Sequence, residues 1–188
     1  MKVRETALPG VLVVEPQVFD DARGFFFETY RAQLYAEAGI PASFVQDNAS
    51  LSERGVLRGL HLQNPNPQGK LIYVLQGEVF DVAVDVRVGS PTFARWTGII
   101  LSGENKLQLY VPEGFAHGIC VLSETALFAY KCTGVYDQAC EISVAWNDPA
   151  IDIQWPVDAP LLSPRDAAAP RLGDIDPGRL PRFAGSGG

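Results

Sequence analysis

The stretch KLIYVLQGEVFDVAVDVR, from Lys70 to Arg87, decides the fold of this chain. It predicts two β-strands joined by a turn at Gln76–Gly77, because β-branched and aromatic residues occur in both halves and glycine marks the turn. In the second half the side chains alternate between two faces, with Phe80, Val82, Val84 and Val86 on one and Asp81, Ala83 and Asp85 on the other. This two-residue period is typical of a strand.

The segments on both sides repeat the pattern of short strands. Before the stretch, strands are predicted at Val11–Glu15, Phe25–Thr29, Phe44–Ser52 and Val56–Gln63. After it, the segments TGIILS, KLQLYV, GICVL, LFAYKCT and EISVAW follow at intervals of roughly 8–12 residues, as in an all-β sandwich or barrel.

Helical signals are few. A helix of about two turns is expected over Arg31–Ala38, because its residues favour helices, Thr29 can cap its start and Gly39 can end it. Residues Arg165–Ala168 can form one further helical turn.

Many short strands with one or two short helices predict an all-β fold, a cupin-type double-sheet jelly roll, which leaves few strand edges exposed. The 188 residues, 47% of them hydrophobic, suffice for one core of ordinary size. A single domain is therefore expected over residues 1–188. The chain is rich in proline after Trp155, which predicts an irregular C-terminal segment over about residues 156–188.

Charge and composition exclude several classes of protein. The 22 acidic and 15 basic side chains give a net charge of −7, so nucleic-acid binding is not expected. No apolar run approaches the roughly 20 residues that cross a bilayer, and no signal peptide is evident, so a soluble cytoplasmic protein without a membrane partner is expected. The three cysteines have no C-x-x-C spacing and suggest neither a disulfide framework nor a zinc site.

The two histidines, His61 and His117, are the first candidates for chemistry, and each lies close to a glycine in a strand-like run. Either one alone is explained as a core histidine, but the pair favours a functional site, since histidine is the commonest general base near neutral pH. The segment Pro112–His117 resembles the second cupin motif, which ends in a metal-binding histidine. Metal cupins also carry H-x-H in the first motif, where this chain has His61, Leu62 and Gln63, so no metal site is expected.

Tyr130 and three arginines are further candidates. Alternation within ALFAYKCT places Tyr130 on an inward apolar face, where it is either a buried aromatic or an acid opposite a histidine base. Arg23, Arg58 and Arg165 are either solvated surface charges or ligands of a diphosphate, whose oxygens suit the guanidinium fork.

One difficulty concerns Arg58 and His61, because strict alternation places them on opposite faces of one strand. Both reach one pocket only if the strand bulges or twists. Gly59 is the position where such a bulge is expected.

The chain contains the motifs VLRGLHLQ, QGKLIYVLQGEVFDVAVDVRVGSPTF, YVPEGFAHGI, YKCTGVY, WNDP and LLSPRDAAAP. From about Arg4 to Leu172 it resembles the dTDP-4-dehydrorhamnose 3,5-epimerase family. The resemblance implies a cupin jelly roll, a homodimer, and neither a cofactor nor a metal. It also implies that C3 and C5 of dTDP-4-dehydro-6-deoxy-D-glucose are inverted to give dTDP-4-dehydro-L-rhamnose, on the route to dTDP-L-rhamnose and to lipopolysaccharide O-antigen.

The resemblance further implies roles for single residues. His61 is implied as the general base, oriented by Asp166, and Tyr130 as the acid on the opposite face of the sugar. Lys70 is implied as a cation near the C4 oxygen. Substrate-binding positions are implied at Arg23, Glu28, Gln46, Asn48, Arg58, His117, Glu141 and Arg165, and Tyr136 matches an aromatic that stacks on thymine.

These residue types suit the chemistry. A ketone at C4 acidifies the protons at C3 and C5, the enolate formed by a base needs a cation near its oxygen, and a proton returned from the other face inverts the carbon. No redox cofactor is needed. The alternatives are a relative that inverts one centre only, a ketoisomerase, a non-catalytic cupin that binds sugar nucleotides, and a metal-dependent cupin oxygenase.

Overall fold

The computed structural model describes residues 1–40 and 43–184, which contain thirteen strands, two short α-helices and one turn of 3-10 helix. The strands are β1 (Lys2–Glu5), β2 (Leu12–Glu15), β3 (Val18–Asp21), β4 (Gly24–Phe27), β5 (Gln46–Glu53), β6 (Leu57–Gln63), β7 (Lys70–Gln76), β8 (Glu78–Asp85), β9 (Trp96–Ser102), β10 (Gln108–Val111), β11 (Phe115–Val121), β12 (Thr125–Cys132) and β13 (Glu141–Ser143). The helices are α1 (Ala32–Glu37), α2 (Pro164–Ala167) and the 3-10 turn η1 (Leu172–Asp174).

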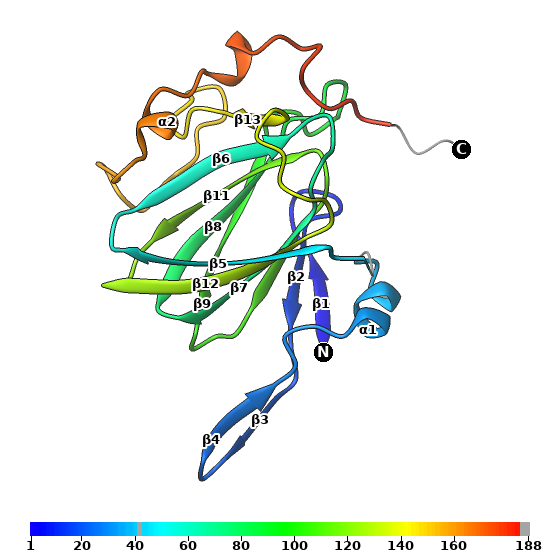
Figure 1. Ribbon diagram of the computed structural model, residues 1–188, viewed down its shortest axis with the longest axis vertical. Helices are drawn as coiled ribbons and strands as arrows, with labels where there is room; N and C mark the ends of the chain where they lie inside the picture. Colours follow the sequence, from blue (N-terminus) through cyan, green and yellow to red (C-terminus); the bar gives the residue numbers. More distant parts are fainter. Residues whose placement is uncertain (41–42, 185–188) are drawn as a thin grey trace.

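Two sheets face each other and form the body of the molecule (Figure 1). The six-stranded sheet has the order β1-β2-β10-β7-β12-β5, and the five-stranded sheet has the order β13-β6-β11-β8-β9. The strands β7 and β8 of the stretch that decides the fold lie in different sheets, so the turn at Gly77 carries the chain from one sheet to the other. The prediction of a cupin-type double-sheet jelly roll is confirmed.

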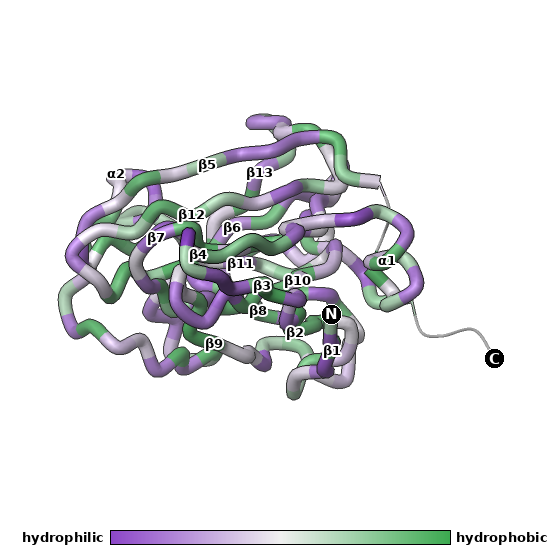
Figure 2. The backbone as a smooth tube through the Cα atoms, turned by 90° about the horizontal axis from the view of Figure 1, so that it is seen from below, coloured by the Kyte–Doolittle hydropathy of each residue, from purple (hydrophilic) through white to green (hydrophobic). Residues whose placement is uncertain are grey.

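Apolar side chains fill the space between the sheets, where Ile72 of β7 packs with Ala83 of β8 and Phe128 of β12. A second cluster lies on the other face of the five-stranded sheet, where Val82 and Val84 of β8 pack against residues of the C-terminal segment. The alternation predicted along β8 is therefore confirmed, although both of its faces are buried. Figure 2 shows hydrophobic and hydrophilic residues following one another along the strands at the surface of this view, for example along β5.

The segment after Trp155 contains only short helical elements and otherwise follows an irregular path. It lies over the β6 and β13 side of the five-stranded sheet (Figure 1) and contributes the buried residues Leu172, Ile175 and Leu180 to the second cluster. Residues 185–188 lie outside the described part of the chain.

The predicted helix is present as α1, but its predicted cap is wrong. Arg31 occupies the N-cap position without a side-chain hydrogen bond, because the helix begins at Ala32, too far from Thr29 for a cap. The carbonyl oxygen of Thr29 instead accepts hydrogen bonds from Tyr35 Oη (3.1 Å) and from Gln108 Nε2 (2.9 Å). These contacts fix α1 against the six-stranded sheet.

The strands β3 and β4 form a two-stranded hairpin that extends away from the body of the molecule (Figure 1). The sequence DDARG was predicted as a turn, but Asp20 and Asp21 belong to β3, and only the residues after them turn. Within residues 1–40 and 43–184, no helix is long and apolar enough to span a membrane.

Candidate active site

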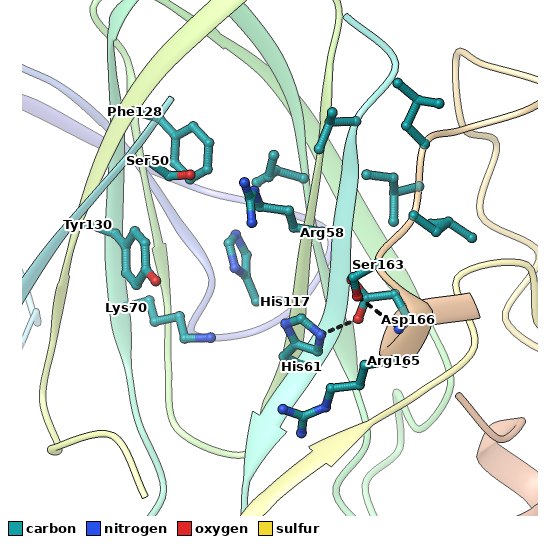
Figure 3. A pocket seen from close by; sticks show the side chains of 15 residues that line it. Ser50, Arg58, His61, Lys70, His117, Phe128, Tyr130, Ser163, Arg165 and Asp166 are labelled. Carbon is teal, nitrogen blue, oxygen red and sulfur yellow. Dashed lines mark hydrogen bonds and ion pairs between the residues drawn. The ribbon is translucent and has the colours of Figure 1, made fainter. Parts of the chain in front are cut away.

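A cavity of about 460 Å³ lies at one end of the space between the two sheets. Strands from both sheets and the segment around α2 supply its walls (Figure 3). The polar and charged side chains in its lining are Ser50, Arg58, His61, Lys70, His117, Tyr130, Ser163, Arg165 and Asp166. Three of the expected substrate-binding residues, Arg58, His117 and Arg165, thus lie on one cavity with all four expected catalytic residues.

His61 of β6 is held by a buried carboxylate. Its Nε2 atom lies 2.6 Å from Oδ1 of Asp166, which is only 4% exposed. Burial raises the pKa of Asp166, but the hydrogen bonds with His61 and Ser163 outweigh it and hold that pKa below its usual value. The ionised carboxylate favours the tautomer with a proton on Nε2, which leaves the Nδ1 lone pair free to act as a base.

Asp166 is placed by the short helix α2. Ser163 is the N-cap residue, and its Oγ accepts a hydrogen bond from the backbone N–H of Asp166 at 3.1 Å. Pro164 occupies the first turn, where its missing N–H has no cost. The sequence SPRD therefore presents the carboxylate to His61 from a segment more than 100 residues away in the chain.

His117 of β11 forms a second histidine–carboxylate pair. Its Nε2 atom lies 2.8 Å from Oδ1 of Asp81 on β8, and Asp81 is fully buried. Because His117 lies opposite His61 in the register of β11 and β6, both imidazole rings line the same cavity. No role was expected for Asp81, although an acidic residue on the inward face of an apolar strand is a signal for one.

Tyr130 and Lys70 come from the opposite sheet. Tyr130 lies across the cavity from His61, and the Lys70 side chain extends into the space between them (Figure 3). Burial raises the pKa of Tyr130, so its hydroxyl keeps a proton to donate at neutral pH. Burial lowers the pKa of Lys70, although the nearby acidic groups of Cys132, Glu141 and Asp81 oppose this shift.

Arg58 reaches the same cavity as His61 because β6 bulges. Between the pairs His117–His61 and Ile119–Arg58, β6 has one residue more than β11. Gly59 lies at the bulge with φ of +122°, and a Cβ atom there would lie 2.6 Å from the carbonyl oxygen of His117. The predicted bulge at Gly59 is confirmed. The Arg58 guanidinium donates to Ser52 Oγ from Nε and Nη2, at 3.1 and 3.0 Å.

A smaller cavity of about 210 Å³ adjoins the first and shares His61, Lys70 and Tyr130 with it. Its lining adds Gln46, Asn48, Tyr136 and Glu141, all expected to bind substrate. Tyr136 donates a hydrogen bond from Oη to Glu141 Oε2 at 2.6 Å, and the Arg165 guanidinium pairs with the same carboxylate. Both cavities together therefore form one site with an inner and an outer part.

Two of the expected substrate-binding residues lie elsewhere. Arg23 is at the turn of the β3–β4 hairpin, where it pairs with Asp21 at 2.6 Å and its side chain is 90% exposed. Glu28 follows the hairpin and pairs with Arg31. Neither residue lines the inner or the outer part of the site in its own chain. No group of three or more possible metal ligands occurs within the described residues.

A base on one side of a cavity, an acid on the other and a cation between them provide the proton transfers that an epimerase needs. The fold and the site therefore define an epimerase built on a cupin-type jelly roll. The family model described as dTDP-4-dehydrorhamnose 3,5-epimerase matches residues 5–174. The chain belongs to this family.

Three relatives show the extent of the similarity. The chain is 56% identical over 169 residues to a dTDP-4-dehydrorhamnose 3,5-epimerase from Neisseria gonorrhoeae, covering 89% of this chain but only 52% of that protein. A dTDP-4-dehydrorhamnose 3-epimerase from Streptomyces niveus is 42% identical over 98% of this chain and 90% of its own. The crystal structure of dTDP-6-deoxy-D-glucose-3,5-epimerase from Legionella pneumophila, in complex with dTDP-4-keto-L-rhamnose, has 53% identity and a TM-score of 0.95, and the match covers 97% of this chain and 98% of that one.

Proposed function

We propose that this protein inverts C3 and C5 of dTDP-4-dehydro-6-deoxy-D-glucose and so forms dTDP-4-dehydro-L-rhamnose, in the synthesis of dTDP-L-rhamnose. The observation that carries the proposal is the placement of His61 and Tyr130 on opposite sides of one cavity (Figure 3). Family membership and the similarity to 3,5-epimerases support the choice of substrate. A base and an acid on opposite faces of a sugar ring are what inversion at carbon requires.

His61 removes a proton from the carbon next to the C4 ketone, and Asp166 stabilises the imidazolium ion that forms. The ammonium group of Lys70 lies in the same cavity and stabilises the oxygen of the enolate, a contribution of about 3 kcal/mol for one well-placed group. Tyr130 then returns a proton from the other face. The high pKa that burial gives Tyr130 keeps this proton in place until the enolate accepts it.

The outer part of the site is proposed to bind the nucleotide. Tyr136 is half exposed and presents an aromatic ring on which thymine can stack. Gln46, Asn48, Glu141 and Arg165 surround this region with polar groups. Arg58 and His117 lie in the inner part, where we propose that they bind the diphosphate close to its bond with the sugar. A chain with a net charge of −7 thereby concentrates cationic side chains where an anionic substrate needs them.

We further propose a homodimer, in which the β3–β4 hairpin of one chain reaches the other chain. An isolated two-stranded hairpin is marginally stable in water. Phe19, Phe25 and Phe26 on this hairpin are each more than half exposed, which is unusual for three large aromatic side chains so close together. A partner surface that covers them would also bring Arg23 and Glu28 near a substrate, as their expected roles require.

The remaining expectations follow from the same proposal. A cytoplasmic location suits a phosphorylated substrate that does not cross membranes, and the product serves the assembly of rhamnose-containing lipopolysaccharide O-antigen. The acidic net charge supports the absence of a nucleic-acid partner. No cofactor or metal enters the proposed steps.

Deuterium incorporation tests the function. The protein is incubated with dTDP-4-dehydro-6-deoxy-D-glucose in D2O, and the product is analysed by NMR. Deuterium is expected at both C3 and C5, and His61→Asn is expected to abolish it. Deuterium at one carbon alone would instead assign a single-centre epimerase, as the name of the Streptomyces niveus relative describes for that protein. Exchange at wild-type rate in His61→Asn would refute the assignment of the base.

A further inference from the structure

Gln63, the last residue of β6, is a buried polar side chain to which the proposed chemistry gives no role. It is 4% exposed, and its amide borders the outer part of the site. Its position is the one where metal cupins carry the second histidine of H-x-H, two residues after His61. A side chain of this kind needs hydrogen-bond partners, because an unpaired buried amide is costly.

The partners of Gln63 all lie in two loops. Nε2 donates to the carbonyl oxygen of Asn66 at 2.8 Å, in the loop between β6 and β7. Nε2 also donates to the carbonyl oxygen of Val135 at 3.3 Å, and Oε1 accepts from the N–H of Asp137 at 2.9 Å. The last two partners lie in the loop between β12 and β13, one on each side of Tyr136.

Two more glutamines hold the backbone of the Tyr136 loop. Gln46 Oε1 accepts from the N–H of Tyr136 at 2.8 Å, and Gln68 Nε2 donates to the carbonyl oxygen of Gly134 at 2.7 Å. Backbone groups of four successive residues, 134–137, are thus bound by side chains of neighbouring segments. These bonds replace the strand pairing that an irregular loop lacks.

We infer that Gln63 is a positioning residue for nucleotide binding, which fixes the Tyr136 ring from both sides through the backbone of Val135 and Asp137. The inference rests on the proposed function, because it takes Tyr136 as the platform for the base. Gln63 suits this task because a primary amide combines donors with an acceptor, so one side chain binds a carbonyl oxygen and an N–H of the same loop. A histidine used as a metal ligand would leave these loop groups without their partner.

The predicted consequence is a loss of nucleotide affinity without a loss of proton transfer. Gln63→Met keeps the length of the side chain and removes all three hydrogen bonds. With two backbone groups beside Tyr136 left unpaired, the loop shifts, and dTDP is expected to bind about tenfold more weakly. Gln63→Glu keeps the acceptor for Asp137 and loses both donors, so its affinity is expected to be intermediate. The turnover number for deuterium exchange at saturating substrate is expected to stay within about twofold of wild type.

The test compares binding of dTDP with binding of inorganic pyrophosphate, which has no base, by calorimetry and by competition. Gln63→Met should weaken dTDP and leave pyrophosphate unchanged. It should have no further effect on dTDP in a Tyr136→Ala background, because the platform is already gone. Gln138→Met, in the same loop but exposed, is the matched control and should behave as wild type. Melting curves establish whether each variant is folded. If Gln63→Met does not fold, Gln63→Glu takes its place in these experiments.

The inference is overturned if Gln63→Met weakens pyrophosphate as much as dTDP, if it lowers turnover at saturation as strongly as affinity, or if its effect adds fully to that of Tyr136→Ala. Unchanged dTDP binding in Gln63→Met would also overturn it. Failure of the proposed function has a different result, because the wild-type protein itself would then neither bind dTDP nor exchange deuterium.

Discussion

Replacing Lys70 by methionine is predicted to make the protein more stable and nearly inactive. Lys70 is the cation proposed for the enolate oxygen, and the ammonium group has no hydrogen-bond or ion-pair partner within the described residues. Burial lowers its pKa even though three acidic neighbours raise it, so the cost of removing the charge from water is the larger effect. Methionine has a similar length and carries no charge to desolvate.

The size of both effects follows from general magnitudes. Replacing a buried ion pair with apolar side chains of similar volume stabilises a protein by up to about 1–4 kcal/mol, and a value near the lower end is expected for the single ammonium group of Lys70, which is only partly buried beside a cavity. For a chain of this length, a gain of about 1–2 kcal/mol raises the melting temperature by roughly 2–8 °C. Loss of about 3 kcal/mol of enolate stabilisation lowers deuterium exchange by on the order of 10².

The gain in stability of Lys70→Met over wild type is predicted to depend on pH. A lysine with a lowered pKa in the folded state loses its proton there at a lower pH than in the unfolded chain. The cost of the buried charge is therefore fully present below the folded pKa and is relieved as pH rises from there toward the ordinary lysine value of 10.5. The advantage in melting temperature of Lys70→Met over wild type should shrink over this range.

The assay is calorimetric unfolding of both proteins at neutral and at alkaline pH, together with exchange in D2O. Lys2→Met serves as a control, since Lys2 forms only an exposed ion pair with Glu15 and should change stability by less than about 1 kcal/mol. A lower melting temperature for Lys70→Met at neutral pH, or a difference that grows with pH, would contradict the reasoning about desolvation. Retained exchange activity would contradict the proposed role at the enolate.

Three further predictions follow from the same structure. Asp166→Asn should lower the turnover number by a factor of about 10²–10⁴ while dTDP binding stays unchanged, because the imidazolium loses its counter-charge but the cavity keeps its shape. Steady-state kinetics will measure the turnover number, and calorimetry will measure dTDP binding. Gly59→Ala should destabilise the protein by about 2 kcal/mol or more in denaturant titration, since φ of Gly59 is +122° and the new Cβ atom would contact the carbonyl oxygen of His117. Gly173→Ala is the control and should not destabilise the protein, because the space around Gly173 is open. The variants Arg23→Ala and His61→Asn should each be impaired alone but should regain activity when they are unfolded and refolded together. A mixed dimer then contains one site with neither defect, which amounts to about a quarter of all sites. No recovery of activity would show that Arg23 serves the site of its own chain.

Sequence patterns predicted a local feature well where the residues of a single strand determine it. The alternation along β8 and the bulge at Gly59 are examples, since side-chain direction within a strand depends on a two-residue period. The pairing of His61 with His117 could not be derived in this way. It depends on the order β6-β11 in the sheet, which strand periodicity does not determine.

The residues that the family resemblance implies for the site line the two cavities, except for Arg23 and Glu28. Their roles stay predictions, because the hairpin that carries Arg23 leaves the body of its own chain (Figure 1), and no local pattern predicts which surface it reaches. Asp81 was seen only as one member of an alternating strand. An acidic residue on the inward face of an apolar strand signals a role, but the contact with His117 comes from the neighbouring strand, so the local pattern does not identify the partner.

The inner part of the candidate site contains features that oppose stability, and the surrounding structure has to compensate for them. Lys70 is a desolvated cation, and Asp81 is a fully buried carboxylate whose Oδ2 atom has no partner within the described residues. Each of these costs on the order of 1–3 kcal/mol, so together they take a large part of the stability of an ordinary domain. Apolar packing on both faces of β8 supplies the opposing free energy, because the strand that carries Asp81 is buried between the main core and the C-terminal segment. The irregular C-terminal segment therefore has two functions, since it presents Asp166 to His61 and also covers the sheet that keeps Asp81 in place.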